Sequence, residues 1–359
     1  MILCLGPTPA AQRVMVFPSL KLDEVNRTAV TLDGAAGKGV NVAKALKSLG
    51  QQPLVVTFLG GERGNALRTE LRRQCITLDY VTVIPETRQC ITVVDQSAGT
   101  QTELVQESSP LNSTAYEKLM RAVRKRMKES RAVVMSGTIP PGGPADLYLK
   151  CARLANDAGL LTVIDAQGPA LLKALAARPS LVKPNRVELA ATLSSNSPTA
   201  TEMPIERRVG APGLQEQRFG TVGRVPSPGV RSIKKPGRRR PKPSGVSERD
   251  LERGIVHLSE LGAQRIVVTA GKEPTLAFDG RTFWRISSPR IKAVNPIGSG
   301  DSFTAALVWR LLRGDDLGEA CRWGAAAGTA NALTLMPGEF RRQDVEKLVR
   351  RAQIERLRR

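Results

Sequence analysis

The amino-acid sequence predicts an α/β fold in three layers, with a mostly parallel central sheet between helices and a small second β-sheet beside it. Two observations support this prediction. From residue 113 onward, strand-like apolar runs alternate with helical patterns, as they do in proteins built on parallel sheets. Two earlier regions, 12–33 and 85–107, contain shorter and more exposed strand patterns, which we expect to form the second sheet.

The predicted elements follow one another along the chain. The first strand spans 1–6, and the glycine-rich stretch 34–38 opens a helix whose apolar face ends before Gly50. Hairpins are predicted for 87–95 with 100–106 and around Asp279–Gly280. The other strands are predicted at 53–61, 78–84, 132–137, 160–166, 180–185 and 265–271, and the other helices at 63–74, 113–129, 144–158, 169–176, 186–193, 248–261, 315–333 and 342–357.

The composition is that of a soluble globular protein with enough material for a large core. The chain has 359 residues, of which 41% are hydrophobic and 24% are charged. Its five cysteines lie far apart and its one histidine, His257, falls in a helical surface pattern. These features argue against a zinc site, a disulfide framework or a Ser-His-Asp triad, and they fit a reducing cytoplasm. No membrane span or signal peptide is expected.

The net charge of +21 is unevenly distributed. Residues 205–243 contain eleven Lys and Arg against two Glu. Such a cluster raises nucleic acid or an anionic substrate as a partner, although a solubilising segment is the plainer interpretation. The surrounding stretch 195–247 is rich in Pro, Gly, Ser and Arg, and we expect it to be a disordered insertion in a surface loop.

The chain is organised around residues 293–310. An extended run ends at Pro296, a glycine turn follows at Gly298, Ser299 and Gly300, and Asp301 opens an apolar helix. The turn and the helix start can aim N–H groups at a phosphate. Asp301 could then take a proton from a hydroxyl that attacks this phosphate. The alternative is an ordinary strand–turn–helix in which Asp301 or Ser302 is an N-cap.

A second glycine turn precedes the first helix. Gly37, Lys38, Gly39 and Asn41 stand at the helix start, where they could hold an anionic or hydroxylated ligand. This turn is not a Walker A loop, because Gly39 stands where Ser or Thr should follow the lysine.

Several strings in order resemble the ribokinase-like sugar kinases, in particular the phosphofructokinase-B (PfkB) branch with 1-phosphofructokinase and tagatose-6-phosphate kinase. The signatures are AGKGVNVAKAL (36–46) and NPIGSGDSF (295–303). Further strings are EVNR (24–27), ETR (86–88), TELV (102–105), SGTIPPG (136–142), VKPNRVE (182–188), VTAG (268–271), TANAL (329–333) and PG (337–338). The resemblance implies a single ribokinase-like kinase domain over 1–359, with ATP and Mg²⁺ as cofactors.

The resemblance also implies roles for individual residues. Asp301 would be the catalytic base and Gly298, Ser299 and Gly300 the anion hole. The nucleotide side would comprise Lys183, Asn185, Glu188, Thr269, Gly271 and Asn331, with Glu188 helping to hold Mg²⁺ through water. The sugar side would comprise Gln12, Arg27, Gly37, Lys38, Gly39, Asn41 and Arg88. For Asn185 and Glu188 the alternative is a helix capping box. The regions 12–33 and 85–107 would form a lid that closes over the sugar and often pairs with another subunit.

The sequence departs from the family pattern at four positions, of which Pro274 lies close to the expected nucleotide loop. Gln12 stands where the family has an aspartate, Ala36 replaces a glycine, Cys90 stands where asparagine is common and Pro274 replaces a glycine. Three functions therefore stay open. The first is ATP-dependent phosphorylation of a sugar phosphate, of the type that converts fructose 1-phosphate to fructose 1,6-bisphosphate. The second is a kinase for another acceptor, such as tagatose 6-phosphate, fructose 6-phosphate, ribose or a nucleoside. The third is a degenerate kinase fold that binds a partner such as nucleic acid.

Overall fold

The computed structural model describes residues 1–194 and 247–357. The basic segment 205–243, and the predicted insertion except its last residue, lie outside the described residues. The strands are β1 (Ile2–Leu5), β2 (Ala10–Phe17), β3 (Val30–Ala36), β4 (Pro53–Leu59), β5 (Thr77–Thr82), β6 (Arg88–Asp95), β7 (Thr100–Val105), β8 (Ala132–Ser136), β9 (Leu161–Asp165), β10 (Leu181–Val182), β11 (Ile266–Ala270), β12 (Glu273–Phe278), β13 (Phe283–Ser287) and β14 (Gln353–Leu357). The helices are α1 (Lys38–Ser48), α2 (Gly61–Arg73), α3 (Ser113–Met127), α4 (Leu147–Asp157), α5 (Gly168–Leu175), α6 (Arg186–Ser194), α7 (Glu248–Glu260), α8 (Ser299–Leu311), α9 (Leu317–Ala332) and α10 (Arg342–Val349).

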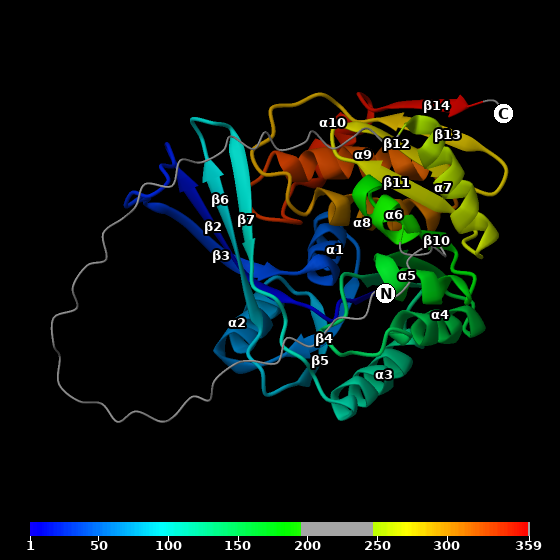
Figure 1. Ribbon diagram of the computed structural model, residues 1–359, viewed down its shortest axis with the longest axis horizontal. Coiled ribbons are helices and arrows are strands. Elements are labelled where there is room, and N and C mark those ends of the chain that lie inside the picture. Colours follow the sequence, from blue (N-terminus) through cyan, green and yellow to red (C-terminus); the bar gives the residue numbers. More distant parts are fainter. Residues whose placement is uncertain (195–246, 358–359) are drawn as a thin grey trace, which may run out of the picture.

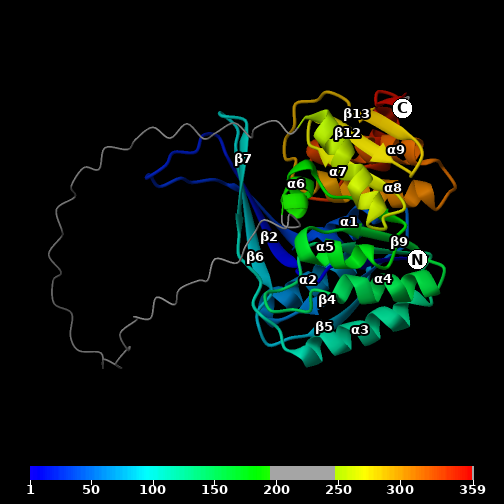
Figure 2. The same ribbon diagram turned by 45° about the vertical axis from the view of Figure 1, so that its right-hand side comes forward.

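A large sheet with the order β14-β13-β12-β11-β10-β9-β8-β1-β4-β5 forms the middle layer. The strands from β11 through β5 in this order run parallel, and β12, β13 and β14 add antiparallel strands at one edge. Helices α1, α2, α8, α9 and α10 pack on one face, and α3, α4, α5, α6 and α7 on the other (Figures 1 and 2). The predicted three-layer fold with a mostly parallel sheet is confirmed.

The strand order reverses at β1, which pairs in parallel with both β4 and β8. Buried apolar side chains fill these strands, as expected for a sheet covered on both faces. In such sheets ligands bind beyond the carboxyl ends of the strands, at the point where the order reverses. The loops that follow β1, β8 and β9 therefore lie where a ligand site is expected.

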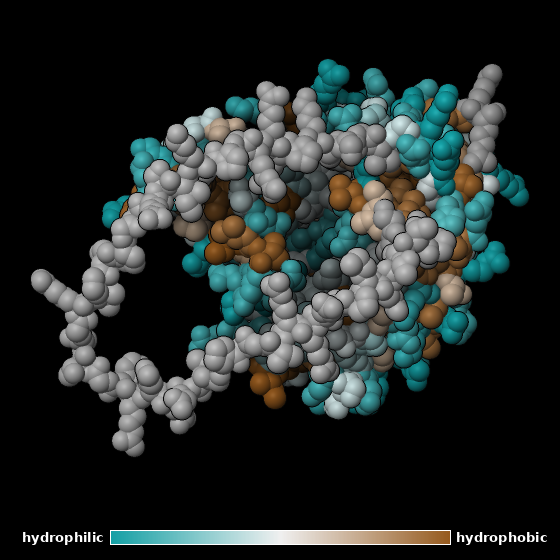
Figure 3. Space-filling model, viewed as in Figure 1, coloured by the Kyte–Doolittle hydropathy of each residue, from teal (hydrophilic) through white to brown (hydrophobic). Residues whose placement is uncertain are grey.

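The second sheet has the order β3-β2-β6-β7 and stands away from the helical layers (Figure 1). The predicted hairpin is present as the antiparallel pair β6 and β7. On the inner face of this sheet, Val14, Val16 and Val94 pack against Met336 of the main body. On the view in Figure 3, hydrophilic residues line a hollow between this sheet and the main body. We call the second sheet the lid, and its outer strands expose Val30, Leu32, Leu104 and Val105.

Three sequence predictions are wrong in detail. The helix predicted over 342–357 ends at Val349, and β14 follows because its alternating residues pair antiparallel with β13. The strand predicted over 180–185 shortens to β10, since the chain then turns into α6. The run before Pro296 is irregular instead of extended strand. Its backbone is held by Asn295, which donates to O of Leu335 at 2.8 Å.

His257 lies on α7, with Nδ1 3.7 Å from a carboxylate oxygen of Glu260, as predicted for a helix-surface residue. None of the helices in the described part of the chain is long and apolar enough to cross a membrane.

Candidate active site

The N-terminus of α8 contains the glycine turn singled out in the sequence. Gly298 has a φ of 81°, which glycine adopts without strain. A Cβ at this position would lie 2.6 Å from Cβ of Pro337, so the turn also needs glycine for space. The first N–H groups of a helix have no partner within the helix and point toward its positive end. The turn is therefore suited to bind an anion.

Asn331 of α9 holds this turn in place through hydrogen bonds. Its Nδ2 donates to O of Ile297 at 2.8 Å and to Oγ of Ser299 at 3.2 Å. Its Oδ1 accepts from Oγ of Ser302 at 3.1 Å and from N of Gly338 at 2.7 Å. The sequence placed Asn331 on the nucleotide side. The structure places it buried behind the turn, where it fixes the backbone that would meet a phosphate.

The start of α1 lies close against the end of β1. Gly37 has a φ of 102°, and a Cβ on Gly39 would be 2.7 Å from Cα of Gly6. Only glycine permits so close an approach of two backbones. This contact brings Lys38 and Asn41 to the carboxyl end of the central strand.

Asp301 is buried and its carboxylate faces α1. Nδ2 of Asn41 donates to Oδ2 of Asp301 at 2.8 Å. Burial raises the pKa of Asp301 from 3.8 to about 7, and the nearby charge of Asp165 adds to this increase, while Lys38, Asn41 and Lys183 oppose it. A carboxylate with a pKa near neutrality is suited to act as a general base.

Asp165 is a site residue that the sequence did not single out. It ends β9 and is buried, with Oδ1 3.3 Å from Nζ of Lys38 and Oδ2 3.0 Å from Nζ of Lys183. Oγ1 of Thr304, on α8, donates to Oδ2 at 3.1 Å. Burial acts to raise the pKa of Asp165, but the two ammonium groups outweigh it and lower the pKa below its usual value. The sequence feature that could have indicated Asp165 is its position as a lone aspartate at the carboxyl end of an apolar strand.

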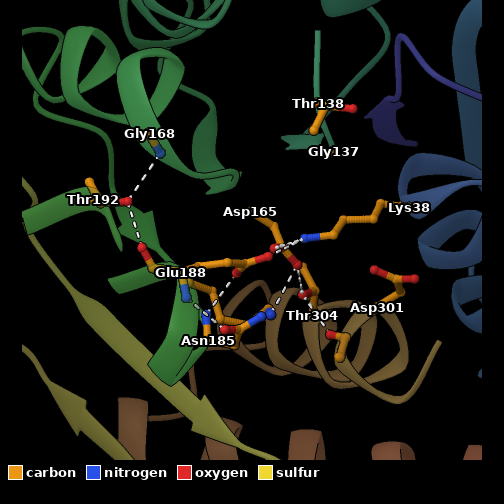
Figure 4. Close-up of polar contacts among 12 residues, drawn as sticks. Lys38, Gly137, Thr138, Asp165, Gly168, Asn185, Glu188, Thr192, Asp301 and Thr304 are labelled. Atoms are coloured by element: carbon orange, nitrogen blue, oxygen red, sulfur yellow. Dashed lines mark hydrogen bonds and ion pairs between the residues drawn. The ribbon is translucent and has the colours of Figure 1, made fainter. Parts of the chain in front are cut away.

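Asn185 and Glu188 form the reciprocal contacts of a capping box. N of Asn185 donates to Oε2 of Glu188 at 2.8 Å, and N of Glu188 donates to Oδ1 of Asn185 at 2.9 Å. The other carboxylate oxygen, Oε1, lies 3.0 Å from Nζ of Lys38. The capping alternative is therefore present in the geometry, and it leaves one oxygen of Glu188 directed into the site (Figure 4).

Lys38 lies among the three carboxylates of the candidate site. It points from α1 toward Asp165 and Glu188, with Asp301 close by (Figure 4). Burial acts to lower the pKa of Lys38, but the three carboxylates outweigh it and raise the pKa. Lys38 thus stays charged, and the structure places it with residues expected on the nucleotide side.

Other residues expected to contact the sugar are arranged around Thr8. Nη2 of Arg88 donates to O of Thr8 at 3.2 Å, and Oγ1 of Thr8 donates to O of Thr138 at 3.3 Å. Gln12 is buried on β2 of the lid, where its Nε2 donates to Oγ1 of Thr92 on β6 at 2.8 Å. Arg27 is exposed in the connection between β2 and β3, and within residues 1–194 and 247–357 no hydrogen bond or ion pair joins it to this cluster.

Two buried polar atoms here have no hydrogen-bond partner within residues 1–194 and 247–357. They are Oδ1 of Asn41 and Nε of Arg88. Because buried polar groups are almost always paired, these two atoms mark positions where a ligand would complete the hydrogen bonding.

The remaining residues expected on the nucleotide side are Thr269 and Gly271. Thr269 lies beside Asn185 in a parallel bridge, and its N donates to O of Pro184 at 3.3 Å. Gly271, with a φ of 63°, makes the turn between β11 and β12. Thr269 lies near the carboxyl end of β11 and Gly271 directly after it, next to the strand that Lys183 follows.

Comparison with known proteins identifies the family. The sequence pattern of the "pfkB family carbohydrate kinase" group matches residues 2–207 and 242–338. The chain belongs to the pfkB family. Its members are carbohydrate kinases, so the chain is a sugar kinase, a phosphotransferase, and kinase chemistry implies the use of ATP.

Individual pfkB relatives cover nearly the whole chain. A tagatose-6-phosphate kinase of Staphylococcus epidermidis is 26% identical over 356 residues, which is 99% of each protein. Phosphofructokinase-2 of Escherichia coli, solved with fructose-6-phosphate, is 24% identical with a TM-score of 0.73, covering 97% of this chain and 98% of that one. A Thermotoga maritima structure that bears the name 1-phosphofructokinase is 21% identical with a TM-score of 0.78 and full coverage of both chains. The structural likenesses show the ribokinase-like fold.

Proposed function

We propose that this pfkB kinase transfers a phosphoryl group from ATP to a sugar phosphate, as in the conversion of fructose 1-phosphate to fructose 1,6-bisphosphate. The observation that supports this proposal best is the buried carboxylate of Asp301. Its pKa of about 7 suits a general base, and it lies at the start of the helix whose N-terminal turn can bind an anion.

In the proposed reaction, Asp301 accepts the proton of the attacking sugar hydroxyl while Asn41 fixes the orientation of the carboxylate. The N–H groups at Gly298, Ser299 and Gly300 stabilise the negative charge of the transferred phosphoryl group. Lys38 stays protonated and supplies positive charge next to the same point. Phosphoryl transfer needs positioning and charge neutralisation more than covalent participation, and these residues supply both.

The residues around Lys38 suit Mg²⁺. Asp165 and Glu188 offer carboxylate oxygens, which Mg²⁺ prefers, and Lys38 already lies between them as a cation. The described residues contain no group of three or more His, Cys, Asp or Glu side chains placed to hold a metal ion by themselves. This fits an ion that is held by one or two carboxylates, water and substrate phosphates. Asp165, and Glu188 through water, would hold the ion, which would neutralise charge on the nucleotide.

A phosphorylated acceptor is supported by the cation at Arg88. Its guanidinium is partly buried, and its Nε has no hydrogen-bond partner among the residues that the structure describes. Phosphate forms charge-assisted hydrogen bonds with arginine. A different acceptor is the second candidate, because Gln12 carries no charge and its Nε2 is already engaged with Thr92.

Turnover with ATP and fructose 1-phosphate, fructose 6-phosphate or tagatose 6-phosphate tests the proposal. We expect one acceptor to be used, and Asp301→Asn to lower kcat by about a thousandfold, within the range of general-base catalysis. Asp157→Asn, at an exposed carboxylate on α4, is the matched control and should have no effect. Turnover only with unphosphorylated sugars would favour the second candidate. Retention of kcat by Asp301→Asn would refute the role of this residue.

We also propose that two copies associate through the lid. The apolar side chains Val30, Leu32, Leu104 and Val105 on its outer strands support this proposal. A form of E. coli phosphofructokinase-2 has been described as tetrameric. We expect light scattering to give at least the mass of a dimer, and Leu104→Asp to shift it toward the monomer. A monomeric wild-type protein at micromolar concentration would contradict the lid contact.

A further inference from the structure

An ion pair between a buried lysine and an exposed glutamate lies one turn along α1 from Asn41, the residue that contacts Asp301. Lys44 is fully buried, and its Nζ lies 2.8 Å from Oε1 of Glu339 and 3.0 Å from O of Ala35. Glu339 is partly exposed at the edge of a pocket of about 800 Å³ between α1, α2 and α9. A buried ammonium is costly unless it is paired, so Lys44 needs this carboxylate.

Glu339 follows a turn that packs directly on α1. A Cβ on Gly338 would come within 2.8 Å of O of Asn41 and of Cβ of Lys44. O of Gly338 accepts from Oγ of Ser48 at 3.0 Å. Residues 41, 44 and 48 lie on one face of α1 because they are three and four positions apart. On this face of α1, Asn41 therefore contacts the carboxylate of Asp301, while Lys44 and Ser48 contact the turn at 337–339.

The same turn connects to the candidate anion hole. N of Gly338 donates to Oδ1 of Asn331, and Nδ2 of Asn331 holds Ile297 and Ser299. Pro337 fills the space in front of Gly298. A displacement of 337–339 from α1 would remove one bond from Asn331 and one packing surface from Gly298.

We propose that Lys44 and Glu339 are positioning residues, and that their ion pair holds the 337–339 turn on α1 and thereby fixes the anion-hole turn at 297–300. This inference rests on the proposed function of that turn. Neither residue reaches the site of the reaction, so their effect passes through Gly338 and Asn331.

Hydrogen–deuterium exchange tests the coupling without a substrate. We expect Lys44→Met and Glu339→Gln to speed exchange in 334–340 and also in 296–302. Lys44→Arg retains the charge and should restore slow exchange. The matched control is Arg341→Gln, which breaks the exposed pair with Asp344 in the same pocket and should leave 296–302 unchanged. Wild-type exchange at 296–302 in both neutral variants would overturn the proposal.

Kinetics gives a second readout. Once an acceptor is known, we expect Lys44→Met and Glu339→Gln to lower kcat about tenfold with little change in KM, because the anion hole acts on the transition state. The double variant should lose no more than the worse single variant. Equal losses in Arg341→Gln, or additive losses in the double variant, would refute the pairing. If Lys44→Met does not fold, Glu339→Gln decides, since its side chain is partly exposed. If the wild type has no kinase activity, the proposed function fails, while the exchange result still decides the coupling.

Discussion

The carboxyl group of Asp301 lies in an environment that favours its neutral form. Burial and the charge of Asp165 raise its pKa to about 7, against the opposing effects of Lys38, Asn41 and Lys183. As a base it must be ionised, so we expect kcat/KM to rise with pH up to about 7 and then to level off. A pH–rate profile with saturating ATP checks this. A flat profile between about pH 6 and about pH 8 would contradict the assignment.

The same raised pKa lowers stability at neutral pH. A carboxyl group whose folded pKa exceeds its ordinary value of 3.8 gives its full stabilisation below that value and loses it as pH rises toward about 7. Asp301→Asn removes this loss. We therefore expect the variant to exceed the wild type in Tm by more at about pH 8 than at about pH 5. An equal difference at both pH values in calorimetry would contradict the raised pKa.

Asp165 has the opposite behaviour, because Lys38 and Lys183 lower its pKa. Its ion pairs stabilise the fold above the ordinary pKa and weaken as pH falls below it. Asp165→Asn leaves Lys183 buried without its partner, so we expect a loss of about 3–5 kcal/mol in the free energy of unfolding. The acid limb of the rate profile should move to lower pH, since Asp165 helps to raise the pKa of Asp301.

The control for Asp165→Asn is Asp146→Asn, which breaks a surface pair with Lys150 on α4. Exposed pairs contribute at most about 1 kcal/mol. Denaturant unfolding that gave equal losses in both variants would contradict a special role for Asp165.

Sequence motifs located the local parts of the site but not the contacts between distant parts. Gly298, Asp301, Asn41 and Lys38 were predicted because glycine turns at helix starts are readable from neighbouring residues. Asp165 was missed because nothing near it in the chain distinguishes it from other strand ends. Its partners Lys38 and Lys183 come from two other elements, and only the sheet order brings all three together.

Among the elements, α1 is placed by one close contact of two backbones. Gly39→Ala should destabilise the protein, because the added Cβ would lie 2.7 Å from Cα and 2.8 Å from N of Gly6, and overpacking costs about 1–3 kcal/mol. In an unconstrained helix the same change would stabilise by up to about 1 kcal/mol. We also expect at least tenfold lower kcat/KM, since Lys38 and Asn41 would shift.

Gly34→Ala on β3 is the matched control for Gly39→Ala. Its Cβ would meet only the terminal methyl of Met336, which can rotate away at little cost. Thermal unfolding should show little change. A stable, active Gly39→Ala protein would show that α1 can move without consequence.

The element order was predictable because long periodic segments carry strong signals. The C-terminal error has a physical reason. Residues 342–357 are rich in Arg, Glu, Leu and Gln, which favour helix, but β13 presents an unpaired edge that β14 completes. Hydrogen bonding to this edge outweighs the local helix propensity. The sequence of residues 342–357 alone does not reveal that the edge is available.

For the whole molecule, the family pattern is interrupted between residues 207 and 242. We expect deletion of 208–241 to leave kcat and KM within about twofold, because a shorter connection changes the closure entropy only slightly. If the basic segment binds nucleic acid, the deletion should also abolish salt-sensitive binding. The measurements are turnover and filter binding at two salt concentrations. Loss of turnover with an unchanged Tm would show instead that the segment takes part in the reaction.

The two helices on either side of this interruption touch each other. A Cβ on Gly254 of α7 would lie 2.8 Å from Cδ1 of Leu193, near the end of α6. Leu193 and Gly254, which flank residues 195–246 in the sequence, therefore lie close together on the face of the sheet away from α1 and α8. The connection between α6 and α7 is therefore a suitable site for inserting another domain. A reporter or binding domain inserted here would follow the C-terminal end of α6, whereas Asn185 and Glu188 of the candidate site lie at its start.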